Sequence, residues 1–387
     1  MRRVSDQERR ARLVTRHALA APAASVEQAV EAVVCLHATE PASVFLAVQA
    51  RTDVDPAAVQ HALYAERSVV KQLAMRRTLF AFPRGLLPAV WGSASRRVAV
   101  QQRTRLAKEV VQLGIAADAD AWLRRVDAQV LASLRDDGPA TTVELRRRVP
   151  DLEHRFEGWQ GASSPIAGRV LTVLGAEARL LRGANELGWR QARHRWCLPE
   201  QWLDEVPAPE EEAAGYRELV GRWLARFGPG TETDLVWWLG ATKGAVRRAL
   251  ADLEAVAVQL DSGATAYLLP DDLEPVGEAR PVASLLPTLD PTLMGWKERD
   301  FYLDPADVPY LFDTNGNGGT TAWWDGRVVG CWVQDDDGRV EVLLRHDPGA
   351  EALRALEVAA ERLTTWLDGD RVNSVYASSM QRGARLP

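Results

Sequence analysis

The chain has 387 residues, of which 47% are hydrophobic and 26% charged, a balance typical of a globular protein with two or three domains. Its three scattered cysteines exclude a disulfide framework and a CxxC zinc site. The charged N-terminal segment and the lack of a long apolar run argue against export and membrane spanning. The cysteine pattern fits a reducing cytoplasm, so we expect a cytoplasmic protein. The net charge of −6 argues against a uniformly basic surface, so a nucleic-acid partner would have to be bound by a local patch.

An amphipathic helix is predicted over residues 26–38, because apolar side chains recur there at helical spacing, and Pro41 disfavours helix at the residue before it. His37 continues the apolar face, and Thr39 and Glu40 follow, so all three are expected at a helix C-terminus beside a buried surface. That position favours a protonated imidazole, which would weaken His37 as a base. The plainer alternatives are a hydrogen-bonded core histidine and a capping threonine.

A first winged-helix unit is predicted over residues 1–82. Two further helices, 42–50 and 56–64, follow the valine-rich one, and the segment SVVKQLAMRRTLFAFP has the pattern of two strands that meet near Met75. Residues 83–119 then have the pattern of a basic helical connector.

The positive charge of the chain is concentrated between Arg67 and Lys108, where ten basic residues occur without one Asp or Glu. Clustered Lys and Arg favour phosphate binding through counterion release. The alternative is a solvated face that pairs with acidic residues from elsewhere. The phosphate-binding candidates in or next to the first unit are Lys71, Arg76, Arg77, Arg96 and Arg97.

An internal repeat organises the middle of the chain. GPATTVEL (138–145) and GPGTETDL (228–235) share a Gly-Pro-x-Thr-x-x-acid-Leu pattern. In each copy a helix precedes the pattern and a capping signal at Thr141 or Thr231 opens a second helix. A third helix and two β-prone segments follow, the second pair around Asp261-Ser262-Gly263.

Three helices followed by a two-stranded wing are typical of the winged helix-turn-helix, whose third helix enters the major groove of DNA. We therefore predict unit 2 over 120–203, an acidic linker over 204–214 and unit 3 over 215–270. Candidate DNA contacts on the third helix of unit 3 are Lys243, Arg247 and Arg248. Such units also serve as scaffolds that bind protein, and tryptophan pairs such as Trp237-Trp238 are explained by core packing or by base stacking.

The remaining residues, 271–387, change in character. Asp-Gly turns separate three apolar segments, which indicates a three-stranded meander, and an amphipathic helix follows over 349–367. We expect a C-terminal β-barrel-like domain with a terminal helix. The fold class predicted for the whole chain is mainly α with β wings (α+β).

The segment CLHATEPASVFLAVQAR (35–51) resembles the signature of the AlkZ-like winged-helix DNA glycosylases, a bacterial family. That family typically has a Leu-Gln-x-Gln motif followed by Glu or Asp and Pro, and then Ala-Arg. SLLPTLDP (284–291) is similar to a second landmark. The positions that match the first motif are Leu36, Ala38, Glu40, Pro41, Ala50 and Arg51. The two glutamines of the family are replaced by His37 and Thr39.

The resemblance implies three tandem winged units, a β-barrel and excision of bulky alkylated purines from damaged duplex DNA, in DNA repair or in self-resistance to alkylating agents. It gives His37 and Thr39 the task of positioning the hydrolytic water and the lesion. Glu40 is the nearest carboxylate that could offset the charge of His37 or act as the base. The motif has no lysine, so a monofunctional enzyme is expected. We expect a monomer without metal or cofactor. The alternative is a DNA-binding winged-helix protein whose catalytic site has been lost.

Overall fold

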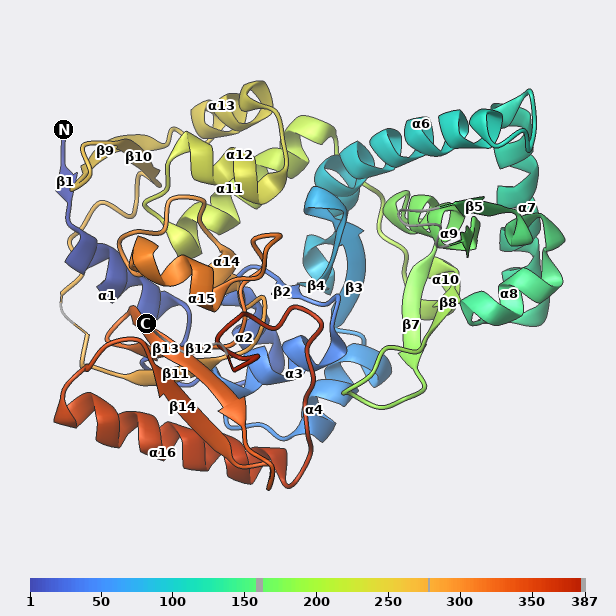
Figure 1. Ribbon diagram of the computed structural model, residues 1–387. Helices are drawn as coiled ribbons and strands as arrows, with labels where there is room; N and C mark the ends of the chain where they lie inside the picture. The colour runs from blue at the N-terminus through green and yellow to red at the C-terminus, as the bar shows by residue number, and fades with distance from the viewer. Residues whose placement is uncertain (158–162, 278, 384–387) are drawn as a thin grey trace.

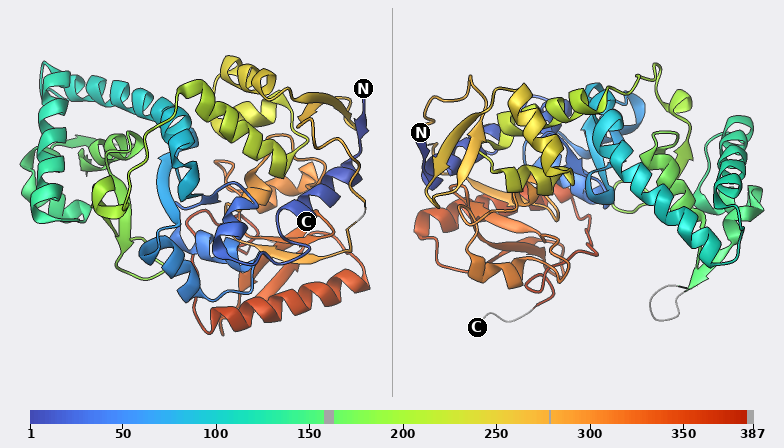
Figure 2. Two further views of the ribbon diagram at one scale, coloured as in Figure 1. Left: turned by 180° about the vertical axis from the view of Figure 1, so that it is seen from behind. Right: turned by 90° about the horizontal axis from the view of Figure 1, so that it is seen from above.

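The computed structural model describes residues 1–157, 163–277 and 279–383. A larger part holds the first and the last of the described residues, and a smaller part stands to one side at the far end of the long helix α6 (Arg96–Gln112) (Figure 1). Two further views show the same separation (Figure 2). The larger part has one large hydrophobic core and a small separate cluster formed by Val4 and residues 258–268. The smaller part has a core of its own, built from the second half of α6 and residues 119–198.

The N-terminal region combines short helices with a small sheet. Its helices are α1 (Asp6–Arg16), α2 (Val26–Glu31), α3 (Pro41–Gln49) and α4 (Pro56–Gln60), the last continued by a π-helical turn, η1 (His61–Ala65). Its strands are β2 (Leu36–His37), β3 (Val69–Ala74) and β4 (Thr78–Pro83), paired antiparallel in the order β2-β4-β3. The predicted hairpin is confirmed, with the turn η2 (Met75–Arg77) at its tip.

The prediction for the valine-rich helix is wrong in its second half, because α2 ends at Glu31 and not at Ala38. Val34 has a φ of 66°, which a helix cannot contain. His37 then pairs with Phe80 of β4. The backbone N–H and C=O groups of this segment therefore form hydrogen bonds with β4 in place of the hydrogen bonds of a longer helix. His37 therefore lies on a strand, and no helix C-terminus is present to favour its protonated form.

The connector and the second repeat form the smaller part and its stalk. Residues 83–119 contain α5 (Leu87–Val90), the π-helical turn η4 (Trp91–Ser95) and α6. The smaller part contains α7 (Ala119–Asp137), α8 (Thr142–Arg148), α9 (Ala167–Ala176) and α10 (Pro199–Trp202). Its strands form two pairs, β5 (Arg155–Glu157) with β6 (Ser163–Pro165), and β7 (Leu181–Asn185) with β8 (His194–Cys197). Single 3-10 turns occupy Arg84–Leu86, Pro150–Glu153 and, in the C-terminal region, Pro305–Asp307.

The third repeat packs in the larger part. It contains α11 (Glu212–Phe227), α12 (Glu232–Leu239), α13 (Lys243–Asp252) and the hairpin β9 (Val256–Leu260) and β10 (Thr265–Leu268). The predicted wing is therefore confirmed. The short N-terminal strand β1 (Arg3–Val4) adds to this hairpin in parallel with β9, so the start of the chain completes the sheet of the third repeat.

Both predicted helix starts are confirmed as capping boxes. Thr141 and Glu144 exchange hydrogen bonds at the start of α8, and Thr231 and Asp234 do so at the start of α12. The two boxes differ in burial, because the Glu144 side chain is 34% exposed whereas Asp234 is fully buried. Asp234 also accepts hydrogen bonds from the backbone N–H groups of residues 297 and 298, at 2.8 and 2.9 Å.

The C-terminal region is an open sheet covered by a helix. Its strands β11 (Ala283–Leu286), β12 (Thr321–Trp324), β13 (Arg327–Gln334) and β14 (Val340–Leu344) pair antiparallel in that order. Two short helices, α14 (Pro291–Met294) and α15 (Val308–Leu311), lie between β11 and β12 in the sequence, and the long helix α16 (Ala350–Leu367) packs on the sheet.

The meander is confirmed, but the prediction of a β-barrel is wrong, since no sheet of the described residues closes. β11 and β14 do not pair with each other, and α16 packs against both of them and so covers the apolar face that closure would have buried (Figure 1). No helix in the described ranges has the length and apolar character needed to span a membrane.

Candidate active site and nucleic-acid interface

The β2-β4-β3 sheet has a different cavity on each face. Because side chains alternate along a strand, Thr78 and Phe80 of β4 face one side and Leu79 faces the other. We call the first space the His37 cavity; its volume is about 180 Å³ and it also contains His37 and Asn317. The second space has a volume of about 410 Å³. It contains Thr39, and we call it the Thr39 cavity.

His37 presents an unpaired polar atom in a mostly apolar setting. Its Nδ1 is buried and has no hydrogen-bond partner among the described residues, and its ring contacts the Phe80 ring edge-on at 5.4 Å between centroids. Burial, and to a smaller extent the charge of Arg76, lower the pKa of His37 to about 3. The expected imidazolium is therefore corrected to a neutral imidazole at physiological pH. A neutral imidazole has one donor and one acceptor nitrogen, so it can orient a water molecule.

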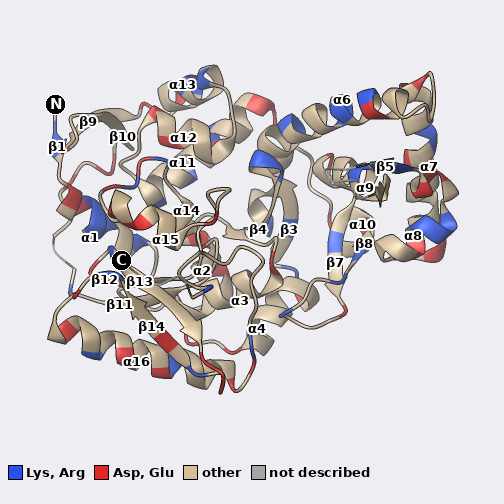
Figure 3. Cartoon of the chain, in the orientation of Figure 1, with Lys and Arg blue, Asp and Glu red and all other residues tan. Residues whose placement is uncertain are grey.

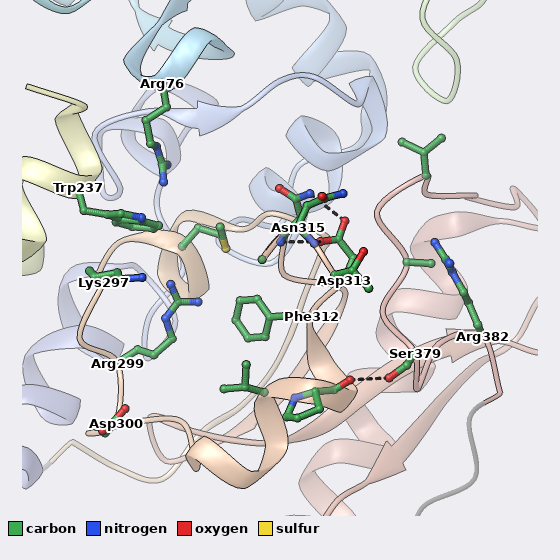
Figure 4. Close-up of a pocket in the computed structure, with 18 of the residues that line it drawn as sticks. Arg76, Trp237, Lys297, Arg299, Asp300, Phe312, Asp313, Asn315, Ser379 and Arg382 are labelled. Carbon is green, nitrogen blue, oxygen red and sulfur yellow. Dashed lines mark hydrogen bonds between the residues drawn. The ribbon is translucent and has the colours of Figure 1, made fainter. Parts of the chain in front are cut away.

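The His37 cavity continues into a much larger cleft. Arg76, Met294 and Asn317 line both spaces, and the outer cleft has a volume of about 1220 Å³. In Figure 4, Trp237, Lys297 and Arg299 form one end of the outer cleft and Arg382 lies at the other. A substrate that places one group beside His37 therefore has room for a bulky substituent outside.

Cationic and aromatic groups meet at the junction of the two spaces. The guanidinium of Arg76 lies 4.1 Å from the centre of the Trp237 ring, and that of Arg299 lies 5.6 Å from the same ring. Loss of solvation within the cleft, together with the charge of Arg299, lowers the pKa of Arg76 to about 10, which leaves it cationic at neutral pH. The sequence left open whether Trp237 packs or stacks; in the structure it lines the outer cleft and its ring contacts these two guanidinium groups.

One carboxylate in the outer cleft stays ionised. Burial alone would raise the pKa of Asp313, but hydrogen bonds from the side chain and N–H of Asn317 and from the N–H of Asn315 outweigh it, so this pKa is lowered. Asn317 lines the His37 cavity, so the 313–317 loop joins an anionic group to the surroundings of His37.

Thr39 and Glu40 do not share the cavity of His37. The chain leaves the strand after His37 and turns into α3, which directs Thr39 to the opposite side of the sheet. Glu40 lines a third cavity of about 220 Å³, where its carboxylate accepts hydrogen bonds from the Ser374 hydroxyl at 2.8 Å and the Val375 N–H at 2.6 Å. Burial raises the pKa of Glu40, and these two bonds oppose the rise only in part.

The basic candidates near the first unit take several different positions. Arg76 lines the His37 cavity, Arg77 lines the Thr39 cavity, and Arg96 is exposed at the start of α6. The Arg97 side chain donates to the carbonyl of Gly240 at 2.9 Å. Lys71 is only 8% exposed and donates to the Tyr64 hydroxyl at 2.6 Å, which places its ammonium away from a surface phosphate.

The three candidates on α13 are exposed but lie apart from both cavities. Arg247 makes a two-pronged ion pair with Glu232 at 2.7 and 3.1 Å, and Arg248 lies 3.6 Å from Asp252. Lys243 has no ion-pair partner among the described residues. Elsewhere, basic positions recur along α6 and on β7, the elements that border the Thr39 side of the sheet (Figure 3).

Sequence reasoning missed several residues of these spaces. Arg299, Asp313 and Asn317 come from the C-terminal region, and Arg182 comes from β7. The run DTNGNGG (313–319) was an available signal, because such residues favour tight turns that present polar groups. Among the described residues, no group of three or more His, Cys, Asp or Glu side chains is arranged to hold a metal ion.

The helix-and-hairpin repeats, the central sheet and the open C-terminal sheet define a mixed α+β protein. The profile of the DNA glycosylase AlkZ-like family matches residues 30–366, and the chain belongs to this family. Its fold is similar to that of the Streptomyces sahachiroi DNA glycosylase AlkZ, with a TM-score of 0.75 over 96% of this chain and 99% of that chain at 21% identity. No curated protein matches the sequence.

Proposed function

We propose that this protein is a monofunctional DNA glycosylase that removes bulky alkylated purines from duplex DNA, with a role in repair of alkylation damage or in self-resistance to alkylating agents. Membership of the family supports a DNA substrate. The observation that carries the proposal is the neutral His37 imidazole, whose unpaired Nδ1 lies in a small cavity that opens into a large cationic and aromatic cleft.

The chemistry requires little from the protein. A purine alkylated at N7 is cationic, and it takes up the electron pair of the C1′–N9 bond when it leaves as a neutral base. The sugar then carries an oxocarbenium-like charge until a water oxygen bonds to C1′. We propose that His37 holds that water by a hydrogen bond and accepts its proton or directs it to solvent. Asp313, ionised in the outer cleft, favours the positive charge on the sugar.

The positions of lysines bear on the reaction type. Covalent lyase chemistry needs an amine near C1′. Among the described residues, no lysine lines the His37 cavity, and Lys297 lies in the outer cleft. We therefore expect hydrolysis without a Schiff base. Borohydride should trap no covalent complex between the protein and a lesion-containing duplex.

The direct test is base release from a duplex that carries one bulky N7-alkylguanine, scored as abasic sites under single-turnover conditions. His37→Ala should slow release at least about a hundredfold, the lower end of the range for loss of a proton-transfer group. His61→Ala is a matched control, because the His61 side chain is 66% exposed on η1. Because the pKa of His37 is about 3, its contribution should also not vary between pH 5 and 8. Undiminished release by His37→Ala would overturn the role of His37.

A second candidate is a DNA-binding protein without catalysis. It is favoured by one observation: the residues at the two glutamine positions of the family line separate cavities, and the Glu40 carboxylate is held by residues 374–375. It predicts salt-dependent duplex binding with no base release from any alkylated duplex.

A further inference from the structure

The Thr39 cavity is rich in guanidinium groups. It lies between the central sheet and the smaller part of the molecule, bordered by α6, α9 and β7. Four arginines line it, namely Arg77, Arg105, Arg169 and Arg182, against a single carboxylate, that of Glu109. The space therefore has an excess of positive charge within the protein surface.

The single carboxylate is already engaged. One carboxylate oxygen of Glu109 accepts a hydrogen bond from the Arg105 Nε at 2.9 Å, and the other forms an ion pair with Arg169. In the described ranges neither Arg77 nor Arg182 has a carboxylate within ion-pair distance. The polar contact of Arg77 is a long one, 3.5 Å to the Gln102 side chain, and the guanidinium of Arg182 lies over the Trp196 ring at 5.2 Å. Two cations of this cavity are thus left without a counter-ion.

A third basic side chain lies behind them. Lys71 is buried next to Arg182, and both its burial and the charge of Arg182 lower its pKa to about 7. The hydroxyl of Thr39 also faces this cavity and has no hydrogen-bond partner among the described residues. Guanidinium groups bind phosphate oxygens through paired N–H donors, and a hydroxyl supplies one more donor. The arrangement suits a single phosphate group.

We propose that the Thr39 cavity binds one phosphodiester of the DNA backbone, held by Arg77, Arg182 and the Thr39 hydroxyl, and that this phosphate flanks the nucleotide whose base enters the His37 cavity. The inference rests on the DNA binding of the proposed function but not on catalysis. Thr39 follows His37 by two residues, a reach of at most about 7 Å along an extended chain. In a nucleotide the phosphate is likewise only a few covalent bonds from the glycosidic carbon.

The test removes charge from both partners in turn. Fluorescent duplexes carry one tetrahydrofuran abasic analogue and one neutral methylphosphonate, moved stepwise through the linkages on either side. Binding is measured by anisotropy over a range of salt concentrations. For the unsubstituted protein, the methylphosphonate at one particular linkage should weaken duplex binding about tenfold, as expected for loss of a charge-assisted hydrogen bond. In Arg182→Gln the same linkage should matter less than about twofold, and the salt slope should fall by about one phosphate.

Variants guard against misfolding. Arg182 packs on Trp196, so Arg77→Gln, at the exposed hairpin tip, provides an independent substitution with the same expected pattern. Arg354→Gln, exposed on α16 away from the smaller part, should bind every duplex as the unsubstituted protein does. Thermal unfolding of each variant confirms folding before binding is compared.

Three results would overturn the inference. Equal sensitivity to every methylphosphonate, in the unsubstituted protein and in both variants, would show that the Thr39 cavity binds no particular phosphate. DNA binding and base release, and with them the proposed function, would be unaffected by that result. Inorganic phosphate that binds through Arg182 at millimolar concentration, without any positional effect in duplexes, would assign the cavity to a free anion. Absence of duplex binding even at low salt would overturn this inference together with the proposed function.

Discussion

The two cavities on either side of the central sheet share a wall but differ in what they offer. The His37 cavity and its outer cleft contain a neutral imidazole, aromatic rings and both signs of charge. The Thr39 cavity contains aliphatic side chains and guanidinium groups, two of them without a carboxylate in the described ranges. Neighbouring residues of β4 line different cavities, since Phe80 lines the first and Leu79 the second. His37 and Thr39, two positions apart in the chain, are divided in the same way.

The difference shows how a short strand that is covered on both faces supports two kinds of chemistry. A substitution on the His37 side should change the rate of base release from the bound complex. A substitution on the Thr39 side should change the affinity for the duplex. The expected effects below separate the two sides, in order of decreasing size.

The largest effect is expected on the wall of the outer cleft. Asp234 is fully buried, caps α12 and accepts two N–H groups from residues 297–298, which precede Arg299 in the cleft. Asp234→Ala removes the acceptor of the buried Thr231 N–H and of the two N–H groups of residues 297–298, and should lower the free energy of unfolding by about 3 kcal/mol. Glu144→Ala, at the partly exposed box of the smaller part, should cost about 1 kcal/mol. Urea denaturation measures both, and equal losses would contradict the assigned difference in burial.

An intermediate effect is expected at Lys71, behind the Thr39 cavity. Tyr64, Arg182 and His194 surround it, and none of them offers a negative charge at neutral pH. Its pKa is about 7 in the folded protein against 10.5 as the ordinary value. Between these values the unfolded chain binds the proton and the folded chain does not, so stability rises with pH from 7 to 10.5.

Lys71→Met should remove this dependence. The variant should gain stability over the unsubstituted protein at pH 6, where the buried charge is present, and should gain less at pH 9.5. The change in the difference should be about 3 kcal/mol. Thermal unfolding at the two pH values measures it, with Arg354→Gln as a surface control. A difference between variant and parent that is the same at both pH values would show that Lys71 titrates normally.

Local signals account for what the sequence predicted well. The capping boxes at Thr141 and Thr231 lie within four residues of the helices they start, and the hairpin at Asp261-Ser262-Gly263 needs only a turn and two β-prone segments. The end of α2 was misjudged because its competitor is β4, more than forty residues away. The parallel pairing of β1 with β9 spans over 250 residues, and no local pattern announces it.

The candidate site divides in the same way. The motif around His37 directed attention to the cavity that we propose as the active site. Which way the side chains after His37 point depends on whether the segment is a helix or a strand. As a helix end it brought His37, Thr39 and Glu40 together, and as a strand end it sends them to three cavities. The residues that line the cavity with His37 come from positions 76–80, 238 and 289–317, and Arg182, which lines the Thr39 cavity with Arg77, comes from β7. Only the fold brings them together.

The smallest effect, at Thr39, distinguishes most sharply between its two proposed roles. Thr39→Val keeps the shape of the side chain and removes one hydroxyl. If Thr39 binds the backbone phosphate, duplex affinity should fall about two- to fivefold, the value of one hydrogen bond. The single-turnover rate at saturating protein should then stay unchanged, and Arg182→Gln should abolish the further effect of Thr39→Val on affinity.

If Thr39 instead holds the hydrolytic water, as the motif position suggested, the saturated rate should fall and the affinity should not. Thr172→Val, on the α9 wall of the same cavity, is the matched control, because the Thr172 hydroxyl already donates to the Gly168 carbonyl within its own helix.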